Sequence, residues 1–157
     1  MIIIQDTREQ QPWNFNSYNE CSAQICDTLK TGDYAIQKYP SLIILERKKS
    51  VGELANNLGK HYDRFVRELE RMQEYTHRYV ICEFSYEKLL MFPKGTNLPR
   101  RVRSKIRMSG KFLAKRVNEL MTCYETEFIF CKDKFEAQDK AMELLIDAYG
   151  QKQTDKL

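Results

Sequence analysis

Apolar and polar positions divide the chain into strand-like runs in its first third and helical stripes after them. Ile2 to Gln5 is the first predicted strand, and its apolar residues 2–4 are consecutive, as expected for a strand buried in a mixed sheet. Residues 33–38 alternate only loosely between polar and apolar but fit a strand, and residues 42–45 are apolar throughout. The segment Tyr39-Pro40-Ser41 between them contains residue types that favour turns. The pattern therefore predicts a tight hairpin early in the chain.

Helical stripes dominate the remaining sequence. Ser50 followed by Glu53 has the form of a capping box, which predicts a helix that starts at residue 51, and Gly59 should end it. Apolar residues three and four positions apart continue this pattern in later segments. Helices are predicted near 51–58, 62–72, 86–91, 110–124 and 134–149, and further strands at 78–84 and 127–131. Residues 20–30 fit a short strand and a helical turn equally well.

The length and order of these elements indicate a single α/β domain. A chain of 157 residues is large enough for one core. Strands first, then helices alternating with more strands, predict a mixed central sheet with helices on both faces. Gly150 is expected to end the last helix. Residues 1–150 should therefore form the domain, and residues 151–157 a disordered polar tail.

Composition excludes several classes of protein. With 42% hydrophobic and 31% charged residues, no run approaches the roughly 18 apolar residues that a membrane span needs. The first strand is too short, and lacks the basic flank, to be a signal peptide, so we expect a cytoplasmic protein. Five cysteines form no Cys-x-x-Cys pair, and their odd number argues against a disulfide framework. The two histidines have no partner at zinc-like spacing, so no structural zinc is expected.

The positive charge is concentrated in one segment. The net charge is only +4, but residues 94–111 contain seven basic and no acidic residues, which leaves 19 basic against 22 acidic residues elsewhere. Like charges at this density need phosphate groups or solvent, so the segment is either a nucleic-acid-binding surface or a solvated flexible loop. Its basic residues are Lys94, Arg100, Arg101, Arg103, Lys105, Arg107 and Lys111.

The predicted hairpin also brings carboxylates together beside a lysine. With the turn centred on the Tyr-Pro step, Asp33 lies opposite Glu46, with Cβ atoms about 5 Å apart. Glu46 and Lys48 are two residues apart and share a face of the strand, whereas Arg47 points to the other. Facing carboxylates repel unless a cation lies between them, and Mg²⁺ is commonly held by one or two carboxylates with water and phosphate oxygens. Lys48 would then orient water or offset charge on a phosphate; alternatively, it only neutralises Glu46 at an exposed strand end.

Three short motifs in this order resemble those of a known nuclease family. They are Asp6-Thr7-Arg8-Glu9, Gly32-Asp33-Tyr34 and Glu46-Arg47-Lys48. Together they resemble the nuclease domain of the XPF-type structure-specific endonucleases, of the restriction-endonuclease-like superfamily, and above all its short members from phages and mobile elements. The resemblance extends over roughly residues 1 to 150. Three motifs in the right order are a specific signal, whereas a lone Glu-x-Lys would be weak.

The resemblance implies roles for individual residues. The implied catalytic group is Asp6, Asp33, Glu46, Arg47 and Lys48, of which Asp6, Asp33 and Glu46 would bind the metal ion, with Arg8, Glu9 and Arg47 as supporting positions. It also implies the restriction-endonuclease-like fold and Mg²⁺ or Mn²⁺ as the cofactor. One position departs from the family pattern, because Gly52 stands where the family commonly has an aspartate, four residues after the Glu-Arg-Lys triplet.

The expected function is that of a divalent-metal-dependent DNA endonuclease acting on branched, flapped or junction DNA. Arg8, Arg64 and the basic residues between 94 and 111 are the expected DNA contacts. The alternative is a catalytically silent DNA-binding or scaffolding partner, because the family includes non-cutting subunits and Gly52 departs from its pattern. An α/β domain unrelated to nucleic acids would leave the basic segment unexplained.

The expected partners are DNA and a second copy of the chain. Family nuclease domains pair through their helices, and the last predicted helix is apolar on more than one stripe, so we expect a homodimer. Neither a membrane nor a small-molecule cofactor is expected.

Overall fold

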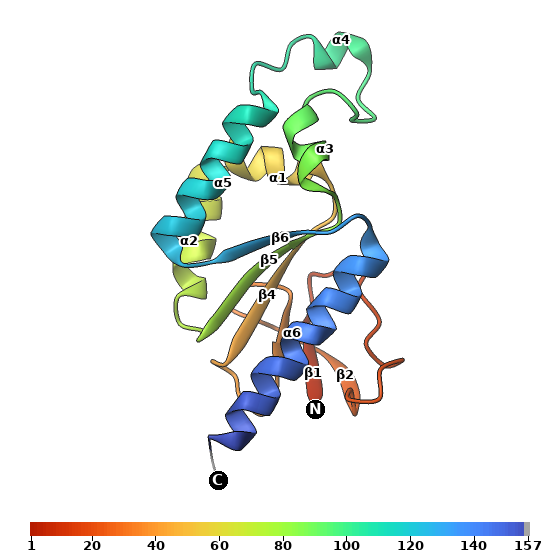
Figure 1. Cartoon of the computed structure of the whole chain (residues 1–157), viewed down its shortest axis with the longest axis vertical. Coiled ribbons are helices and arrows are strands. Elements are labelled where there is room, and N and C mark those ends of the chain that lie inside the picture. The colour runs from red at the N-terminus through yellow and green to blue at the C-terminus, as the bar shows by residue number, and fades with distance from the viewer. Residues whose placement is uncertain (156–157) are drawn as a thin grey trace.

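A six-stranded mixed sheet forms the centre of the molecule (Figure 1). The computed structural model describes residues 1–155. The strand order is β2-β1-β3-β4-β5-β6; β2 and β1 are parallel, β3 is antiparallel to both neighbours, and β4, β5 and β6 are parallel. The strands are β1 (Ile2–Asp6), β2 (Ala23–Asp27), β3 (Tyr34–Ile36), β4 (Ile43–Lys48), β5 (His77–Cys82) and β6 (Glu127–Phe130). The ambiguous segment at 20–30 therefore supplies an edge strand.

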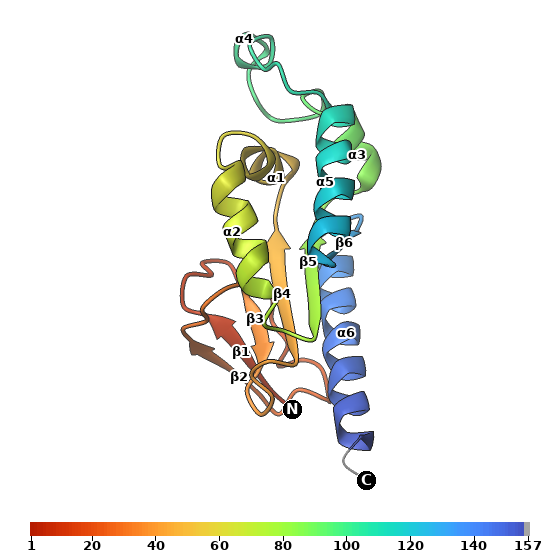
Figure 2. The same cartoon turned by 90° about the vertical axis from the view of Figure 1, so that its left-hand side faces the viewer.

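Helices pack on both faces of the sheet (Figures 1 and 2). They are α1 (Val51–Leu58), α2 (Tyr62–Met72), α3 (Tyr86–Met91), α4 (Arg100–Arg103), α5 (Gly110–Tyr124) and α6 (Lys134–Thr154). One core cluster joins α1, α2, α3 and α5 to the face that carries Ile44 and Val80. The second joins α6 and the loop around Trp13 to the face that carries Leu45 and Ile81. The predicted mixed sheet with helices on both faces is confirmed. Across residues 1–155, no helix is both long enough and apolar enough to cross a bilayer.

The hairpin between β3 and β4 has the predicted register but a longer loop. Tyr34 pairs with Leu45 and Ala35 with Ile44, the register that places Asp33 opposite Glu46. The tight turn was wrong, because β3 ends at Ile36 and residues 37–42 form the connection. The Gln37 N–H donates to the Ile2 carbonyl of β1 at 3.1 Å, so this backbone group is unavailable to the hairpin.

Helix starts follow the predicted caps. The Ser50 hydroxyl accepts a hydrogen bond from the Glu53 N–H at 3.2 Å, and the Glu53 carboxylate accepts one from the Lys49 N–H at 2.8 Å. Gly52 therefore lies in the first turn of α1. Ser109 caps α5 in the same way, accepting from the Phe112 N–H at 3.2 Å.

The last helix is longer than its sequence indicates. Helix α6 continues through Gly150 to Thr154, so the predicted end at Gly150, and a disordered tail beginning at residue 151, were wrong for this stretch. A glycine inside a helix costs only about 0.5–1 kcal/mol relative to alanine. The turns on either side remain hydrogen bonded, and Thr154 Oγ1 donates to the Gly150 carbonyl at 3.1 Å. The part of the predicted tail at residues 156–157 lies outside the described residues.

The glycine before Asp33 is fixed by both conformation and space. Gly32 has φ +72°, and a Cβ there would lie 2.4 Å from Ile44 Cγ1 and 3.2 Å from the Leu45 carbonyl oxygen. Side chains other than glycine are unfavourable in this left-handed region. The backbone can therefore turn into β3 beside β4 only with glycine at this position.

Replacing Gly32 should be far more damaging than replacing Gly150. Gly32→Ala should lower the free energy of unfolding by about 2–5 kcal/mol, from left-handed strain plus overpacking. Gly150→Ala is the matched control, because its Cβ would meet nothing within 4 Å, and it should raise the free energy of unfolding by about 0.5–1 kcal/mol. Urea titration measures both values. A loss of stability in the Gly150 variant would contradict the helical extension of α6.

Candidate active site

Three aspartate and glutamate residues lie in one row across β1, β3 and β4. The Asp6 N–H donates to the Asp33 carbonyl at 2.8 Å, and the Asp33 N–H donates to the Leu45 carbonyl at 2.8 Å. Continuing the two antiparallel registers places Asp6 opposite Asp33, and Asp33 opposite Glu46. Residues directly opposite each other have their side chains on the same face of a sheet. The backbone therefore brings together the three acids that the motifs single out.

The Asp6 carboxylate is already occupied by protein donors. Its Oδ1 accepts from the Arg8 N–H at 3.0 Å and from Arg8 Nε at 2.6 Å, and its Oδ2 accepts from the Leu29 N–H at 2.8 Å. Burial raises the pKa of Asp6, but these hydrogen bonds outweigh it and hold the pKa below its ordinary value. Asp6 therefore anchors the β1 end and the loop before Leu29, and its position in the row does not by itself make it a metal ligand.

Asp33 and Glu46 form the pair of carboxylates that the hairpin predicts. Asp33 Oδ2 accepts a hydrogen bond from the Arg47 backbone N–H at 2.7 Å. Burial raises the pKa of Asp33, and the neighbouring negative charge of Glu46 raises it further. An ionised Asp33 is thus unfavourable unless positive charge is added, as expected for two carboxylates that share a confined site.

Lys48 lies against this pair, inside the protein. Its Nζ is 2.7 Å from Glu46 Oε1 and 5.0 Å from the centre of the Phe65 ring on α2. Both Lys48 and Glu46 are buried, so the interpretation of a surface pair at an exposed strand end was wrong. Burial alone would lower the pKa of Lys48, but the charges of Glu46 and Glu68 more than offset this and raise it. Lys48 is therefore a fixed, permanently charged ammonium group.

Glu68 of α2 belongs to the same group of side chains. Its side chain is hydrogen bonded to that of Glu46 and lies close enough to Lys48 for their charges to interact. Burial raises the pKa of Glu68, and the Glu46 charge adds to this effect. Glu68 is not among the site residues expected from the sequence. The signal that would have found it is its spacing of three from Phe65, which puts it beside the buried stripe of α2.

The carboxyl groups of this site could neutralise a divalent cation, but they do not form a complete set of ligands for it. Three carboxyl groups, of Asp33, Glu46 and Glu68, lie beside a single ammonium group, and all three can be ionised together only if positive charge is added. Within residues 1–155, however, no three histidine, cysteine or acidic side chains converge as a metal centre. Magnesium commonly binds one or two carboxylates and completes its shell with water and phosphate oxygens. Asp33 and Glu46 fit that mode of binding.

Arg47 lies on the opposite face of β4 and does not join these side chains. Its Nε is 2.6 Å from Glu83 Oε1, and its Nη1 is 3.4 Å from Glu9 Oε2. The same Nη1 donates to the Gln11 carbonyl, and the guanidinium lies 5.0 Å from the Trp13 ring. Arg47 is therefore a supporting residue. Its guanidinium contacts Glu9 and Glu83 and does not lie beside Glu46 and Lys48.

The neighbours of Arg47 are tied into the core. Glu83 Oε1, which pairs with Arg47, also accepts from Trp13 Nε1 at 2.8 Å. Trp13 is fully buried and stacks on Tyr34 with ring centres 5.1 Å apart, so its ring packs inside the protein and is not free to stack on a base. All five cysteines are free, as expected.

Basic residues lie at the edge of the site and on a projecting arm. Arg8 leaves 68% of its side chain exposed, and its charge interacts with those of Asp6, Asp33 and Glu68. Arg64 is exposed on α2. Residues 94–109, here called the basic arm, leave the body between α3 and α5 and carry the short helix α4 at their tip (Figures 1 and 2). The predicted loop therefore contains a helical turn.

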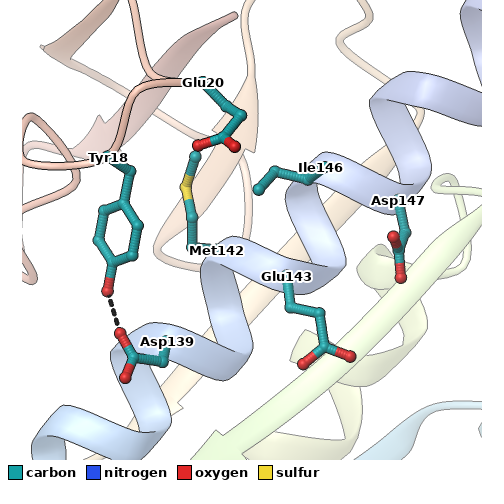
Figure 3. A pocket seen from close by; sticks show the side chains of 7 residues that line it. All are labelled: Tyr18, Glu20, Asp139, Met142, Glu143, Ile146 and Asp147. Atoms are coloured by element: carbon teal, nitrogen blue, oxygen red, sulfur yellow. Dashed lines mark hydrogen bonds between the residues drawn. The ribbon is translucent and has the colours of Figure 1, made fainter.

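Two hollows on the surface lie away from the acids of the sheet. One of about 280 Å³ runs along α6 and is lined by four carboxylates and Tyr18, whose hydroxyl donates to Asp139 (Figure 3). The other, of about 660 Å³, lies between α3 and α5. Neither contains Asp33, Glu46 or Lys48. The acidic hollow would repel phosphate, so it offers no nucleic-acid contact.

Comparison with known proteins agrees with this arrangement. Residues 5–140 match the model of the ERCC4 domain. The chain belongs to the ERCC4 domain family. The structure is similar to XPF from Aeropyrum pernix, with 20% sequence identity, a TM-score of 0.64, and coverage of 92% of this chain and 63% of that one. A second structure of that protein, in complex with DNA, matches with 19% identity, a TM-score of 0.61, and coverage of 98% and 66%.

The matches to known proteins are few, distant and partial in length. No curated protein matches this ERCC4-family chain significantly. The chain spans less than two thirds of the length of the XPF chains that it matches. At this identity, the structural likeness carries the fold alone. The predicted membership of the XPF-type nuclease-domain family is confirmed.

Gly52 leaves room for the side chain that the family pattern has at this position. A Cβ there would meet only Ser50 Oγ, at 3.9 Å. Gly52 is the second residue of α1, two positions before the buried Leu54. Neither conformation nor space therefore requires glycine, and the missing aspartate is not explained by packing.

Replacing Asp6 and Asp33 by asparagine should affect stability in opposite directions. In EDTA near pH 8, Asp33→Asn should raise the free energy of unfolding by about 1–3 kcal/mol, because the amide keeps the acceptor for the Arg47 N–H and is neutral beside Glu46 without having to bind a proton on folding. Asp6→Asn should lower it by a similar amount, because an amide N–H₂ would face the donors of Arg8 or Leu29.

Metal binding separates the two positions further. Calorimetric titration with Mn²⁺ should show binding to the natural chain that is lost in Asp33→Asn. Unchanged binding in that variant would exclude Asp33 as an essential ligand, and a stabilised Asp6 variant would contradict its anchoring role.

Proposed function

We propose that this chain is a divalent-metal-dependent DNA endonuclease that hydrolyses phosphodiester bonds. The observation that carries the proposal is the group of Asp33, Glu46 and Lys48 on one face of the sheet, in which a second carboxyl group, that of Asp33, lies beside the Glu46–Lys48 ion pair without a positive charge of its own. A buried site with unbalanced carboxylates is costly for a fold and is typical of metal-assisted hydrolysis. The basic arm and Arg8 supply the positive surface that a DNA substrate requires.

Each residue of the site has a distinct role in this proposal. Asp33 and Glu46 would hold Mg²⁺ or Mn²⁺, and Glu68 adds negative charge beside them. The ion, when bound, would activate a water molecule and polarise the phosphate. Lys48 stays protonated between Glu46 and Phe65, where it can donate hydrogen bonds to the negative charge that develops on the phosphate. Arg47 holds Asp33 through its backbone N–H and keeps the strand end rigid.

The proposed substrate is branched, flapped or junction DNA, in repair or recombination. The family and the neighbour whose structure contains DNA support DNA as the partner. Asp6 remains in the proposal as the acid next to Asp33 in the same row. Its hydrogen bonds to protein donors mean that it is not proposed as a direct metal ligand in this state. A cytoplasmic location, or the nucleoid of a host cell, is part of the same proposal.

A catalytically silent DNA-binding partner is the second candidate. Three observations favour it. Glu46 already forms an ion pair with Lys48, and the described residues contain no converged set of three metal ligands. The third is Gly52, which stands where the family pattern has an aspartate although there is space for that side chain. This candidate keeps the same DNA surface and differs only in chemistry, so a cleavage assay separates the two.

Cleavage should depend on Glu46 and Lys48. Labelled duplex, flap, fork and four-way-junction DNA would be incubated with Mg²⁺, Mn²⁺ or EDTA. Glu46→Gln and Lys48→Gln should each reduce the cleavage rate by about 100-fold or more, as expected when a group that stabilises the transition state is removed. Glu70→Gln, an exposed change on the same helix as Glu68, is the control and should cleave normally. DNA binding without metal-dependent cleavage by the natural chain would favour the silent partner instead.

The basic arm should contribute phosphate contacts that do not depend on DNA structure. Replacing Arg100, Arg101 and Arg103 by alanine should weaken binding to all DNA forms and reduce the slope of log K against log salt by about 0.9 for each lost contact. The control removes three exposed lysines elsewhere, Lys38, Lys134 and Lys152, and should leave most of the slope intact. Anisotropy titrations at several salt concentrations give the slopes. Equal losses in both variants would mean that binding depends only on net charge.

A homodimer remains part of the proposal. The apolar residues of α6 that suggested it are largely used within the chain, because Ala141, Met142 and Leu145 are buried against the sheet. Phe135 is the exception and leaves 75% of its surface exposed. Light scattering at micromolar concentration should give the mass of two chains, and a monomer with intact cleavage would refute the dimer.

A further inference from the structure

The tip of the basic arm exposes apolar side chains that the fold does not use. Leu98 and Val102 leave 39% and 42% of their surface exposed. Neither belongs to a core cluster of the described residues, whereas Ile106 and Met108, on the returning limb, pack against the core. The limb is therefore anchored by its apolar residues, and the tip presents its own to the outside.

Arginines surround this exposed apolar pair. Helix α4 contains three arginines in four residues, with Val102 between them. None of the arm's basic side chains forms an ion pair with any of residues 1–155. The Nε of Arg103 is covered, yet it has no hydrogen-bond partner in this part of the chain. A binding partner that fits the tip must therefore offer negative charge and an apolar surface side by side.

The arm holds its tip away from the body on a fixed base. The Gly110 N–H donates to the Phe92 carbonyl at 2.9 Å, which ties the two ends of the arm together. A Cβ at Gly110 would lie 2.1 Å from the Leu90 carbonyl oxygen, so the start of α5 is packed directly on the end of α3. Thr96 Oγ1 also donates to the Pro93 carbonyl at 2.7 Å. The base of the arm is therefore held by the body, and helix α4 at its tip projects away from the sheet (Figure 2).

A branch point in DNA offers the surface that the tip requires. In a continuous duplex each base pair is stacked on both sides, but at a branch the terminal pair exposes an apolar face next to phosphates. Proteins that distort DNA insert leucine, isoleucine or similar side chains between bases, with basic residues on the flanking backbone. We propose that Leu98 and Val102 form a wedge that stacks on the exposed base pair of a DNA branch, while Arg100, Arg101 and Arg103 hold the adjoining phosphates.

This inference rests on the proposed DNA binding and adds the residues that would distinguish a branch from a continuous duplex. It does not require cleavage. It also differs from the role of the arm's charge, which attracts every form of DNA alike. The apolar pair and the arginines can therefore be tested separately.

Binding in EDTA tests the wedge without any contribution from catalysis. Anisotropy would compare a flap or fork with a duplex of equal length, for the natural chain and for the double variant Leu98→Ser with Val102→Ser. The variant should lower the branch-to-duplex affinity ratio by about tenfold, in the range expected when two partly exposed aliphatic side chains lose an apolar contact, and should keep its salt slope. Val102→Thr, which preserves shape, should cause a smaller loss, and Phe135→Ser removes an even more exposed apolar side chain elsewhere as the control.

A fluorescent base at the branch reports the contact directly. 2-Aminopurine at the terminal pair should change its emission when the natural chain binds, and much less with the double variant. An unchanged affinity ratio, an equal loss for branch and duplex, or no change in emission would overturn the wedge. A mass that halves when Leu98 and Val102 are replaced would show that the tip binds a second copy instead, which also overturns it. Discrimination retained by a chain that never cleaves would refute only the nuclease, and failure to bind any DNA would refute both.

Discussion

Three successive charged residues are buried at the end of β4. The side chains around them are positioned to neutralise their charges. Glu46, Arg47 and Lys48 are at most 6% exposed. An unpaired ion in such a place costs several kcal/mol, so each must find a partner of opposite charge. Because side chains alternate along a strand, Glu46 and Lys48 pair with each other on one face, and Arg47 must be paired on the other.

The second face is supplied from distant parts of the sequence. Glu83 follows β5 and Glu9 follows β1, and both reach the Arg47 guanidinium. Trp13 closes this side by stacking on Tyr34 and donating to Glu83. The ion pairs thus fasten the loop after β1 to the far side of β4, and the rigid backbone at Arg47 in turn holds Asp33 through one hydrogen bond. The side chain of Arg47 stabilises the fold, and its backbone positions the acid.

Patterns within single segments predicted the structure best. The register of β3 and β4, the cap at Ser50 and the shared face of Glu46 and Lys48 all follow from local spacing, and the structure agrees. Predictions were wrong where contacts with a segment distant in sequence determine the local structure. The hairpin loop is long because Gln37 bonds to β1, and Glu68 is drawn into the site because α2 packs over β4. The α6 error differs, because one glycine is too weak a signal to end a long, packed helix.

The distribution of charge links metal binding to DNA placement. The interior site holds three carboxyl groups beside one ammonium group, while six basic side chains that form no ion pair with residues 1–155 project on the arm. Phosphates drawn in by the arm would be repelled by any of these acids that is ionised, since like charges in a low-dielectric pocket interact strongly. In the proposed nuclease, a divalent ion between Asp33 and Glu46 would reverse that repulsion at the bond to be cut. The arm would then select the DNA that approaches, and the ion would allow its phosphate to enter the site.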